Sequence, residues 1–434
     1  MIYFVYNILV TILLLLSIPY FVLRSLISKR FRKALPQRLG FFQSPSFKKP
    51  TWVHAASVGE VICAIPLLKK IKKELPDSKI VLTTMTSTGN ETARLRIPEA
   101  DQIHFVPIDH PLIVRRTITK IQPGLLLVAE TELWPNLLRS FGKRGIPIVL
   151  FNGRISQKSF RRYLLLKFFF KECLKYISLF LMQTEEDQER VVQIGVESQK
   201  TKVVGNLKFD QTHPSFTQET LSKMAEALGL HGENKILIAG STHSGEEEIL
   251  VSLYKKLKNI DSQLLLILAP RHLERLEEVE RILKKESISW LRKTSFLTDA
   301  GRSDRGRPEV ILLDTMGELI SIYSLGTLVF VGGSLVRIGG HNPLEPLFFR
   351  KCVLFGPHMF NFMEISRRLI EIEGAIQVSG KEELFSQLKR LLFDQRAREE
   401  VGERGYRFLQ RHRGATERMF EEIRPFLIKK TPSA

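Results

Sequence analysis

The chain has 434 residues, of which 44% are hydrophobic, so it is long and apolar enough for two or three packed domains. Its 65 basic and 46 acidic residues give a net charge of +19, which favours an anionic partner: a membrane surface, a nucleic acid or a phosphorylated substrate. The three cysteines, Cys63, Cys173 and Cys352, are far apart and have no neighbouring His or Cys at metal-ligand spacing. This excludes a disulfide framework and a structural zinc site, and it fits a reducing compartment.

Residues 2–23 form an uncharged apolar run that predicts a membrane-anchor helix. At about 1.5 Å per residue it would reach roughly 33 Å, enough to cross a bilayer. The run lacks the basic start and the small-residue cleavage site of a signal peptide. The charges that follow it are all basic, so the positive-inside rule predicts that the rest of the chain lies on the cytoplasmic side. These charges belong to Arg24, Lys29, Arg30, Arg32 and Lys33.

Between residues 34 and 212, short runs rich in β-branched residues alternate with amphipathic stretches. The runs are TWVHAAS, KIVLTTM, QIHFVP, GLLLVAE, PIVLFNG, LFLMQT and KVVGNL. This alternation is typical of βαβ units, and uninterrupted apolar runs indicate strands that are buried on both faces of a parallel sheet. We therefore predict a Rossmann-like domain over residues 34–212, preceded by the anchor and its basic flank over residues 1–33.

Within this domain, the stretch from Lys158 to Tyr176 is both apolar and basic and predicts one amphipathic helix. Such a helix could lie on an anionic lipid surface, where each basic residue adds on the order of 1 kcal/mol. An ordinary core-packing helix with a solvated face is the alternative. The expected basic stripe is Lys167, Lys171 and Lys175, and the expected apolar face is Leu165, Leu166, Phe169, Phe170 and Cys173.

The pattern pauses at residues 209–234, where Pro214 precedes a short helix that ends at Gly229. A second series of apolar runs follows: KILIAGS, SQLLLILAP, SISWLRK, EVILLDT, GTLVFVGG, KCVLFG and GAIQV. We therefore predict a second Rossmann-like domain over residues 213–434 and an α/β architecture in which two such domains face a cleft. Because open α/β sheets bind ligands at the carboxyl ends of their strands, the active site is expected in that cleft.

Two carboxylates in the first domain follow predicted strands. Glu60 lies in HAASVGE, where a strand ends, Gly59 allows a tight turn and a helix begins. It could point into the cleft, or it could form a capping box in which Ser57 is the N-cap and Glu60 stands at N3. Glu130 ends the run GLLLVAE and is either an acid beside the reacting centre or a solvated carboxylate. If they share a site, one could accept a proton from a hydroxyl while the other adjusts the local field.

In the second domain, VGGSLVRIGGHNPLEP over residues 331–346 places two glycine pairs before Asn342 and Pro343. Asn at the N-cap and Pro at N1 predict a helix N-terminus, which offers free N–H groups to an anion such as a phosphate. Glu345 in the first turn could receive the two hydroxyls of a ribose, or it could serve only as a cap.

Two further strand ends strengthen this expectation. LAPRH contains Pro270 and Arg271, and LLDTMGE contains Met316, Gly317 and Glu318. The guanidinium of Arg271 offers a two-pronged donor for a phosphate, although an Arg after Pro is more often a surface residue.

Several motifs are absent from the sequence. It contains no G-x-x-x-x-G-K-[ST] P-loop and no G-x-S-x-G nucleophile elbow, which disfavours the usual NTPases and hydrolases. It also contains no D-x-D pair of the kind that often holds a metal on a nucleotide-sugar diphosphate. A metal-independent reaction with no cofactor is favoured.

Eight motifs occur in one order behind the apolar run: HAASVGE, TTMTSTG, AETELWPNLL, GNLKFD, STHSGEEE, APRH, DTMGEL and GGSLVRIGGHNPLEP. In this order the chain resembles the bacterial Kdo transferases, which add 3-deoxy-D-manno-octulosonic acid to the lipopolysaccharide core. The resemblance implies a GT-B glycosyltransferase fold, CMP-Kdo as donor and a lipid A precursor, the tetraacylated disaccharide bisphosphate, as acceptor.

The same resemblance implies roles for individual residues. It makes Glu60 the general base and gives transition-state stabilisation to Glu130 and Lys208. It implies that CMP binds against Pro270, Arg271, Met316, Gly317, Glu318, Asn342, Pro343, Leu344 and Glu345. Of these side chains, only Lys208 offers no signal of its own, since a lysine at a strand end reads as a surface charge.

The reaction expected from this is an inverting transfer at the cytoplasmic face of the inner membrane, with an anionic membrane surface as a further partner. Other classes remain open: another GT-B transferase that uses a different nucleotide sugar, or a membrane-bound nucleotide-binding scaffold without activity. Nucleic-acid binding is disfavoured because the basic residues are scattered and no aromatic stacking motif accompanies them.

Overall fold

The computed structural model describes residues 2–211, 217–230, 234–297 and 308–428. The chain divides into two compact units, Met1–Thr212 with His412–Ala434, and His213–Arg411. The predicted boundary between residues 212 and 213 falls in a stretch outside the described residues. Each unit is built on its own seven-stranded parallel sheet, so the α/β prediction is confirmed.

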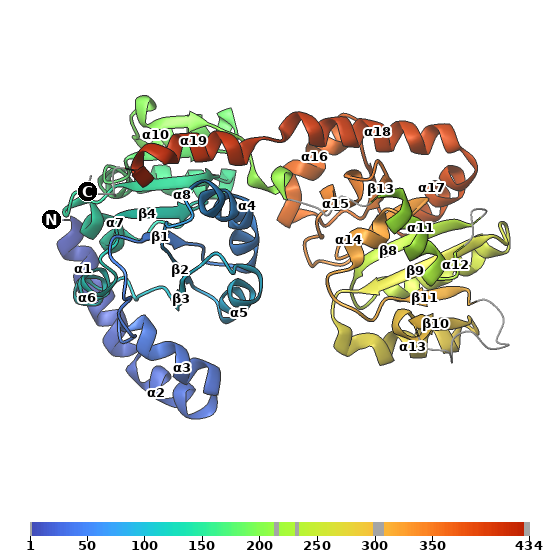
Figure 1. The fold of residues 1–434 in the computed structure, drawn as a ribbon, viewed down its shortest axis with the longest axis horizontal. Coiled ribbons are helices and arrows are strands. Elements are labelled where there is room, and N and C mark those ends of the chain that lie inside the picture. The colour runs from blue at the N-terminus through green and yellow to red at the C-terminus, as the bar shows by residue number, and fades with distance from the viewer. Residues whose placement is uncertain (1, 212–216, 231–233, 298–307, 429–434) are drawn as a thin grey trace. The chain divides into compact units, whose positions relative to one another are not determined.

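The sheet of the first unit has the order β3-β2-β1-β4-β5-β6-β7, with every neighbouring pair parallel (Figure 1). Chain order reverses between β1 and β4, which makes this pair the topological switch point of the sheet. The strands are β1 (Thr51–His54), β2 (Ile80–Thr84), β3 (Gln102–Phe105), β4 (Leu125–Ala129), β5 (Ile148–Gly153), β6 (Leu179–Met182) and β7 (Thr201–Val203).

Helices cover both faces of this sheet, which is why its strands are apolar without alternation. Alternate residues of β1 enter opposite cores: Val53 packs with α4, and Trp52 packs with α6 and α7. The helices of this part are α4 (Val58–Glu74), α5 (Ser87–Arg96), α6 (Pro111–Ile121), α7 (Pro135–Gly142), α8 (Gln157–Leu165), α9 (Lys167–Leu174) and α10 (Glu185–Ile194).

The last helix, α19 (Ala415–Ile428), belongs to the first unit and not to the second, so the predicted extent of the C-terminal domain is wrong here. Its buried residues, among them Met419 and Ile423, join the same core as α4. Asp210 accepts the backbone N–H of Gly414 at 2.7 Å, and Arg418 donates to the Val204 carbonyl at 2.9 Å. Burial of an apolar stripe against α4 decided this placement, which sequence position could not reveal.

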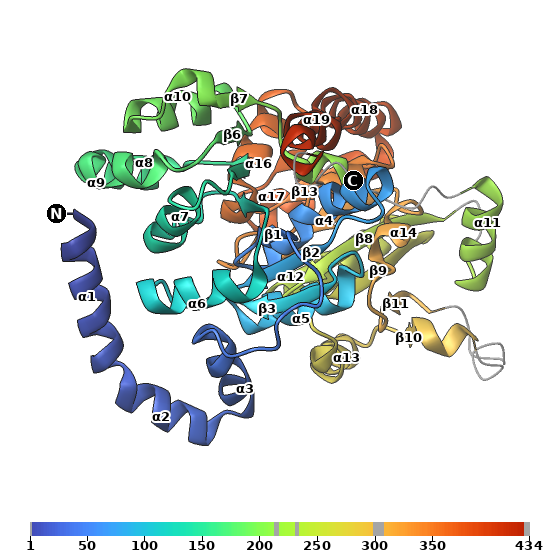
Figure 2. The same cartoon turned by 60° about the vertical axis from the view of Figure 1, so that its left-hand side comes forward.

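The predicted continuous helix over residues 2–23 is also wrong. The chain forms α1 (Ile2–Leu16) and α2 (Ile18–Ile27), which are bent by 45° at Ser17, and then α3 (Lys29–Arg38) (Figure 2). Pro19 in the first turn of α2 has no N–H to donate, which interrupts the helical ladder. Among the described residues, no single helix meets the length and hydropathy of a bilayer span, whereas α1 and α2 meet them together.

One side of α1 is held to the first unit by polar contacts. Tyr6 donates to the Asp109 carboxylate at 2.9 Å, and Thr11 is hydrogen-bonded to His110 at 3.3 Å. The Arg139 guanidinium lies 4.3 Å from the Tyr3 ring centroid. The other sides expose large apolar residues, such as Leu13 at 63% and Leu16 at 72%.

The predicted helix from Lys158 to Tyr176 is divided into α8 and α9 at Leu166. As a result, the predicted apolar face is split: Cys173 is buried, whereas Leu165 is 85% exposed. Phe168, next to the break, is 74% exposed.

The second unit repeats the architecture with the sheet order β10-β11-β9-β8-β12-β13-β14, again parallel throughout (Figure 1). Its switch point lies between β8 and β12. The strands are β8 (Lys235–Thr242), β9 (Leu264–Pro270), β10 (Trp290–Arg292), β11 (Val310–Leu312), β12 (Leu328–Val331), β13 (Cys352–Phe355) and β14 (Ile376–Gln377). The helices are α11 (Gln218–Ala227), α12 (Glu246–Lys258), α13 (Leu276–Lys285), α14 (Leu319–Tyr323), α15 (Leu344–Leu347), α16 (Met363–Glu371), α17 (Lys381–Phe393) and α18 (Gln395–His412).

Candidate active site

Polar side chains gather at the carboxyl edge of the first sheet, beside its switch point. Glu60 opens α4 directly after β1, and Glu130 follows β4. Lys208 lies in the one-turn helix after β7. All three charges act on the thiol of Cys63, whose pKa is raised above all by burial and then by Glu130. The charges of the three predicted catalytic residues therefore all act on one buried thiol.

The surroundings of Glu60 combine a cap with a perturbed carboxyl. Ser57 accepts the backbone N–H of Glu60, and its hydroxyl donates to one carboxylate oxygen at 2.8 Å. The backbone N–H of Ala56 donates to the other oxygen at 2.8 Å. The capping interpretation is thus correct, but Glu60 is only 8% exposed, and burial raises its pKa to about 7. A carboxyl with this pKa can take up a proton near neutral pH.

The segment after β4 adds a strained backbone and a second acid. Glu130 has φ +52°, a left-handed conformation that non-glycine residues rarely adopt and that is common at functional sites. Glu132 is half-buried, and burial raises its pKa. Glu130 and Glu132 both raise the pKa of Glu60 further. Glu132 had no sequence signal apart from its place in AETELWPN.

His54, at the end of β1, is fully buried and held in one tautomer. The indole N–H of Trp134 can only donate, so the Nε2 atom of His54, at 3.2 Å, accepts. Nδ1 therefore carries the proton and faces the Thr83 carbonyl at 3.2 Å. Burial lowers the pKa of His54 to about 4, so the ring is neutral at physiological pH. The Nε2 atom of His54 also lies 4.0 Å from the Glu132 carboxylate, so the ring supports the loop that carries Glu132.

A chain of amide hydrogen bonds leads from β5 to Lys208. Asn152, buried and left-handed at φ +53°, accepts the backbone N–H of Leu207 at 3.0 Å and donates to Cys63 Sγ at 3.1 Å. Gln183 donates to the Asn152 carbonyl at 2.9 Å and accepts from Asn206 at 2.7 Å. Asn206 in turn accepts the backbone N–H of Lys208 at 2.9 Å. This network fixes the backbone of Lys208, and sequence reasoning missed it because its members are far apart in the chain.

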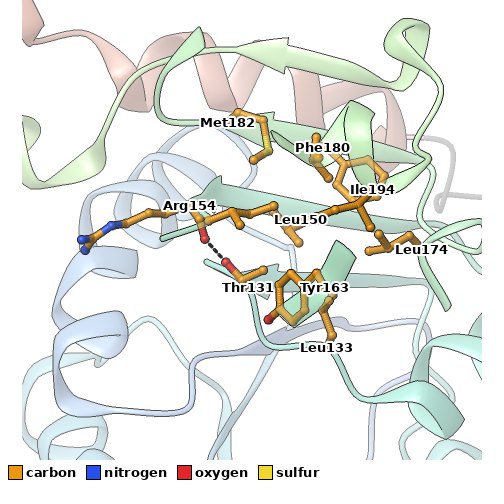
Figure 3. Close-up of a pocket in the computed structure, with 11 residues that line it drawn as sticks. Thr131, Leu133, Leu150, Arg154, Tyr163, Leu174, Phe180, Met182 and Ile194 are labelled. Atoms are coloured by element: carbon orange, nitrogen blue, oxygen red, sulfur yellow. Dashed lines mark hydrogen bonds between the residues drawn. The ribbon is translucent and has the colours of Figure 1, made fainter. Parts of the chain in front are cut away.

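A small apolar cavity of about 10 Å³ lies behind this edge, with room for roughly one water (Figure 3). Leu150, Phe180 and Met182 line it from the sheet. Thr131 donates to the Arg154 carbonyl at its rim, while the Arg154 guanidinium points away (Figure 3). The cavity is too small for a substrate and belongs to the packing of the sheet.

In the second unit, polar residues converge after β8, β9 and β12, beside the switch point. Pro270 ends β9, and the backbone N–H of Arg271 donates to the Thr242 carbonyl at 2.9 Å. The charge of Arg271 acts on both His243, after β8, and His341, after β12. In the described part of the chain, no carboxylate is paired with the Arg271 guanidinium, whereas Arg275 is paired with Glu247 and Glu278.

The glycine-rich segment does not offer its first N–H groups to a ligand. The carboxylate of the fully buried Glu246 accepts the backbone N–H groups of Gly333 at 2.7 Å and of Ser334 and Leu335 at 2.9 Å. A carboxylate of the protein itself thus binds the N–H groups that follow the first glycine of this segment. The N–H groups of the second glycine pair, Gly339 and Gly340, donate to the Gly333 carbonyl at 3.2 and 2.8 Å.

Asn342 lies just before a very short helix. Its side chain accepts the backbone N–H of Leu344 at 3.1 Å and donates to Glu345 at 3.4 Å. The N-cap is Pro343 and the helix begins at Leu344, one residue later than predicted. The four-residue α15 gives little dipole, so side chains have the larger part in any ligand contact here.

The remaining predicted residues lie in the turn after β11. Met316 is 59% exposed, and Gly317 has φ +85° with open space around it. Glu318 accepts from Lys293 and Thr315, contacts that lower its pKa against the effect of burial. Lys293, which sequence reasoning missed, therefore fixes this carboxylate.

Across the described ranges, no group of three His, Cys, Asp or Glu side chains is arranged to hold a metal ion.

Two doubly wound parallel-sheet units, each with polar side chains at its switch point, define the GT-B fold. Solved structures share the fold: a glycosyltransferase from Rickettsia africae has a TM-score of 0.56 at 11% identity and covers 89% of this chain and 100% of its own. A UDP-N-acetylglucosamine 2-epimerase has a TM-score of 0.57 at 14% identity, covering 89% and 99%.

Sequence comparison gives the family. Residues 33–211 match the model of the family described as 3-deoxy-D-manno-octulosonic-acid transferase. The 3-deoxy-D-manno-octulosonic acid transferase of Haemophilus influenzae is 37% identical over 409 residues, 93% of this chain and 94% of the relative. That of Chlamydophila psittaci is 30% identical over 432 residues, 98% and 96% of the two chains. The chain belongs to the 3-deoxy-D-manno-octulosonic acid (Kdo) transferase family.

Proposed function

We propose that the chain transfers Kdo from CMP-Kdo to a lipid A precursor, the tetraacylated disaccharide bisphosphate, in lipopolysaccharide synthesis. Family membership supports Kdo as the transferred sugar. The two sets of strand-end residues support separate roles for the two units. The first unit activates the acceptor, and the second binds CMP through Pro270 and Arg271, residues 316–318 and residues 342–345.

The reaction is an inverting displacement. A hydroxyl oxygen of the acceptor bonds to the anomeric carbon of Kdo while the bond from that carbon to the phosphate oxygen of CMP breaks. Glu60 takes the hydroxyl proton, and CMP leaves with the bonding electron pair. The observation that carries this assignment is the buried Glu60 carboxyl, whose pKa near 7 suits a general base at neutral pH.

Charged side chains stabilise the charges that develop during the transfer. Lys208, fixed by the Asn206 and Asn152 network, and Glu130 act beside Glu60, and Arg271 meets the phosphate of the leaving CMP. Because CMP carries a single phosphate, these groups suffice without a metal ion. Activity in EDTA that equals activity in Mg²⁺ is the expected result.

The amino-terminal helices hold the enzyme at the inner membrane, at its cytoplasmic face. Support comes from the exposed apolar side chains of α1 and α2, next to the basic α3, which suits an anionic lipid surface. The exposed Leu165 and Phe168 at the break between α8 and α9 add apolar area beside basic residues.

A transfer assay with the full chain in detergent tests the proposal. CMP-Kdo is generated in situ, the acceptor is the tetraacylated bisphosphate, and product mass is followed over time. We expect stepwise gains of one Kdo unit for the wild type and for Glu74→Gln, an exposed carboxylate at the far end of the same helix. Glu60→Gln should form product at least about 100-fold more slowly. No gain with the wild type beside an active control enzyme would reject Kdo transfer.

A further inference from the structure

His243 and His341 form a hydrogen-bonded imidazole pair at the switch point of the second unit. Their Nε2 atoms lie 2.8 Å apart, and the rings are nearly parallel at 4° with centroids 5.1 Å apart. The two residues are 98 positions apart in the chain and come from the loops after β8 and β12. Neither loop shows this pairing in its sequence.

The pair shares one proton between its facing nitrogens. Two neutral imidazoles can make this bond only if one Nε2 donates and the other accepts. The donor ring then has an unprotonated Nδ1, and the acceptor ring has a protonated Nδ1. A metal bonded to both Nε2 atoms would hold them about 3.4 Å apart at tetrahedral angles, so the observed distance fits a proton and not a metal.

Hydrogen bonds hold the backbone on both sides of the pair. Glu246 holds the N–H groups of residues 333–335 and also accepts the backbone N–H of His243 at 3.0 Å. Gly333 in turn accepts the N–H of Gly340 at 2.8 Å, and Gly332 accepts that of His341 at 3.2 Å. A Cβ atom at Gly333, where φ is +68°, would lie 3.1 Å from the His341 ring, so a larger residue here would strain the backbone and crowd the pair.

The charges that face the pair are mostly positive. Arg271 and His272 lower the pKa of both rings, and Arg275 lowers that of His243, while burial is the largest cause for each ring. Glu247 and Glu278 neutralise Arg275, and Glu246 is occupied by backbone donors. The pKa values, about 4 for His243 and about 3 for His341, make the pair neutral at pH 7. An unpaired guanidinium beside two neutral imidazoles favours an oxyanion.

We propose that His243 and His341, together with Arg271, bind the phosphate of the donor nucleotide as one proton-sharing unit that takes up a proton when the phosphate binds. The inference rests on the proposed function, since that function supplies the nucleotide. A phosphate oxygen accepts from the protonated Nδ1 of one ring, and its negative charge favours protonation of the other ring. Both rings then carry cationic character only while the anion is present.

Calorimetric titration of the full chain with CMP, in two buffers of different ionisation enthalpy at pH 6.5, measures affinity and proton uptake together. Cytidine, inorganic phosphate and free Kdo are titrated as separate ligands. The variants are His243→Asn and His341→Asn, with His104→Asn as matched control. His104 is half-buried in the first unit, and burial likewise lowers its pKa to about 4. Thermal unfolding of each variant verifies its fold.

We expect the wild type and His104→Asn to take up more protons on binding CMP than the two pair variants do. They should also bind CMP with at least about tenfold higher affinity than those variants. Cytidine should bind all four proteins equally. If the folded pair variants bind CMP as tightly as the wild type, or if they lose affinity for free Kdo and not for CMP, the phosphate assignment is overturned. Failure of the wild type to bind CMP would instead reject the proposed donor.

If both pair variants fail to fold, His341→Gln and His243→Gln replace them, and the proton uptake of the wild type alone decides. Uptake equal to that expected from the phosphate of CMP itself would overturn the proposal.

Discussion

The carboxylate of Glu246 accepts the backbone N–H of Gly333 at 2.7 Å, although 87 residues separate them. One buried carboxylate thereby joins the loops after β8 and β12. Backbone N–H groups that could bind an anion are present in this loop, but the Glu246 carboxylate accepts them.

We expect Glu246→Ala to lower the free energy of unfolding by about 3 kcal/mol or more, because it leaves several buried N–H groups without an acceptor. Urea unfolding of the full chain measures it. Glu248→Ala, an exposed neighbour on the same helix, is the control and should change the free energy by less than about 0.5 kcal/mol. Equal stability of the two variants would contradict the role of Glu246.

The pH dependence of Kdo transfer should show the titration of Glu60. Its raised pKa of about 7 means that the base form is the minor species below pH 7 and the major one above it. kcat/KM should therefore rise with pH, with a midpoint near 7, and then level off. In Glu60→Gln the residual rate should not show this rise with pH. A rise that persists in the variant would come from the titration of another group.

Asn152→Ala should lower kcat about tenfold and change KM for CMP-Kdo little. The substitution removes the acceptor of the Leu207 N–H and places a residue less tolerant of φ +53° at the site, so Lys208 loses its fixed backbone. Asn152→Asp keeps the acceptor and should recover part of the rate. If Asn152→Ala raises KM alone, the network does not act through the reaction step.

Leu13→Glu with Leu16→Glu should abolish sedimentation of the protein with vesicles that contain anionic lipid, because both side chains are more than 60% exposed on α1. Activity on detergent-dispersed acceptor should be kept. Leu95→Glu, at a site that is 84% exposed on α5, is the matched control and should sediment as the wild type does. Unchanged sedimentation of the double variant would remove α1 from the membrane proposal.

Sequence patterns predicted the two parallel sheets because continuous apolar runs must be buried on both faces, a local property that can be read along the chain. They also offered the capping box of Ser57 and Glu60 as one of two interpretations, since such a box spans only four residues. They missed two helix breaks: the one before Pro19 at the amino terminus and the one at Leu166 within residues 158–176.

The family and the class of reaction could be inferred from the sequence because short motifs occur in a recognisable order along the chain. That order can be read even though the contacts between the motifs cannot. Only the tertiary structure decided four features. They are the contacts of Glu246 with residues 333–335, the His243–His341 pair, the Asn152 network and the placement of α19. Each joins residues between about 50 and 350 positions apart, and parallel strands bring such residues to one sheet edge only after the core has packed. The sequence by itself determined which groups the protein has; folding determined which of them meet.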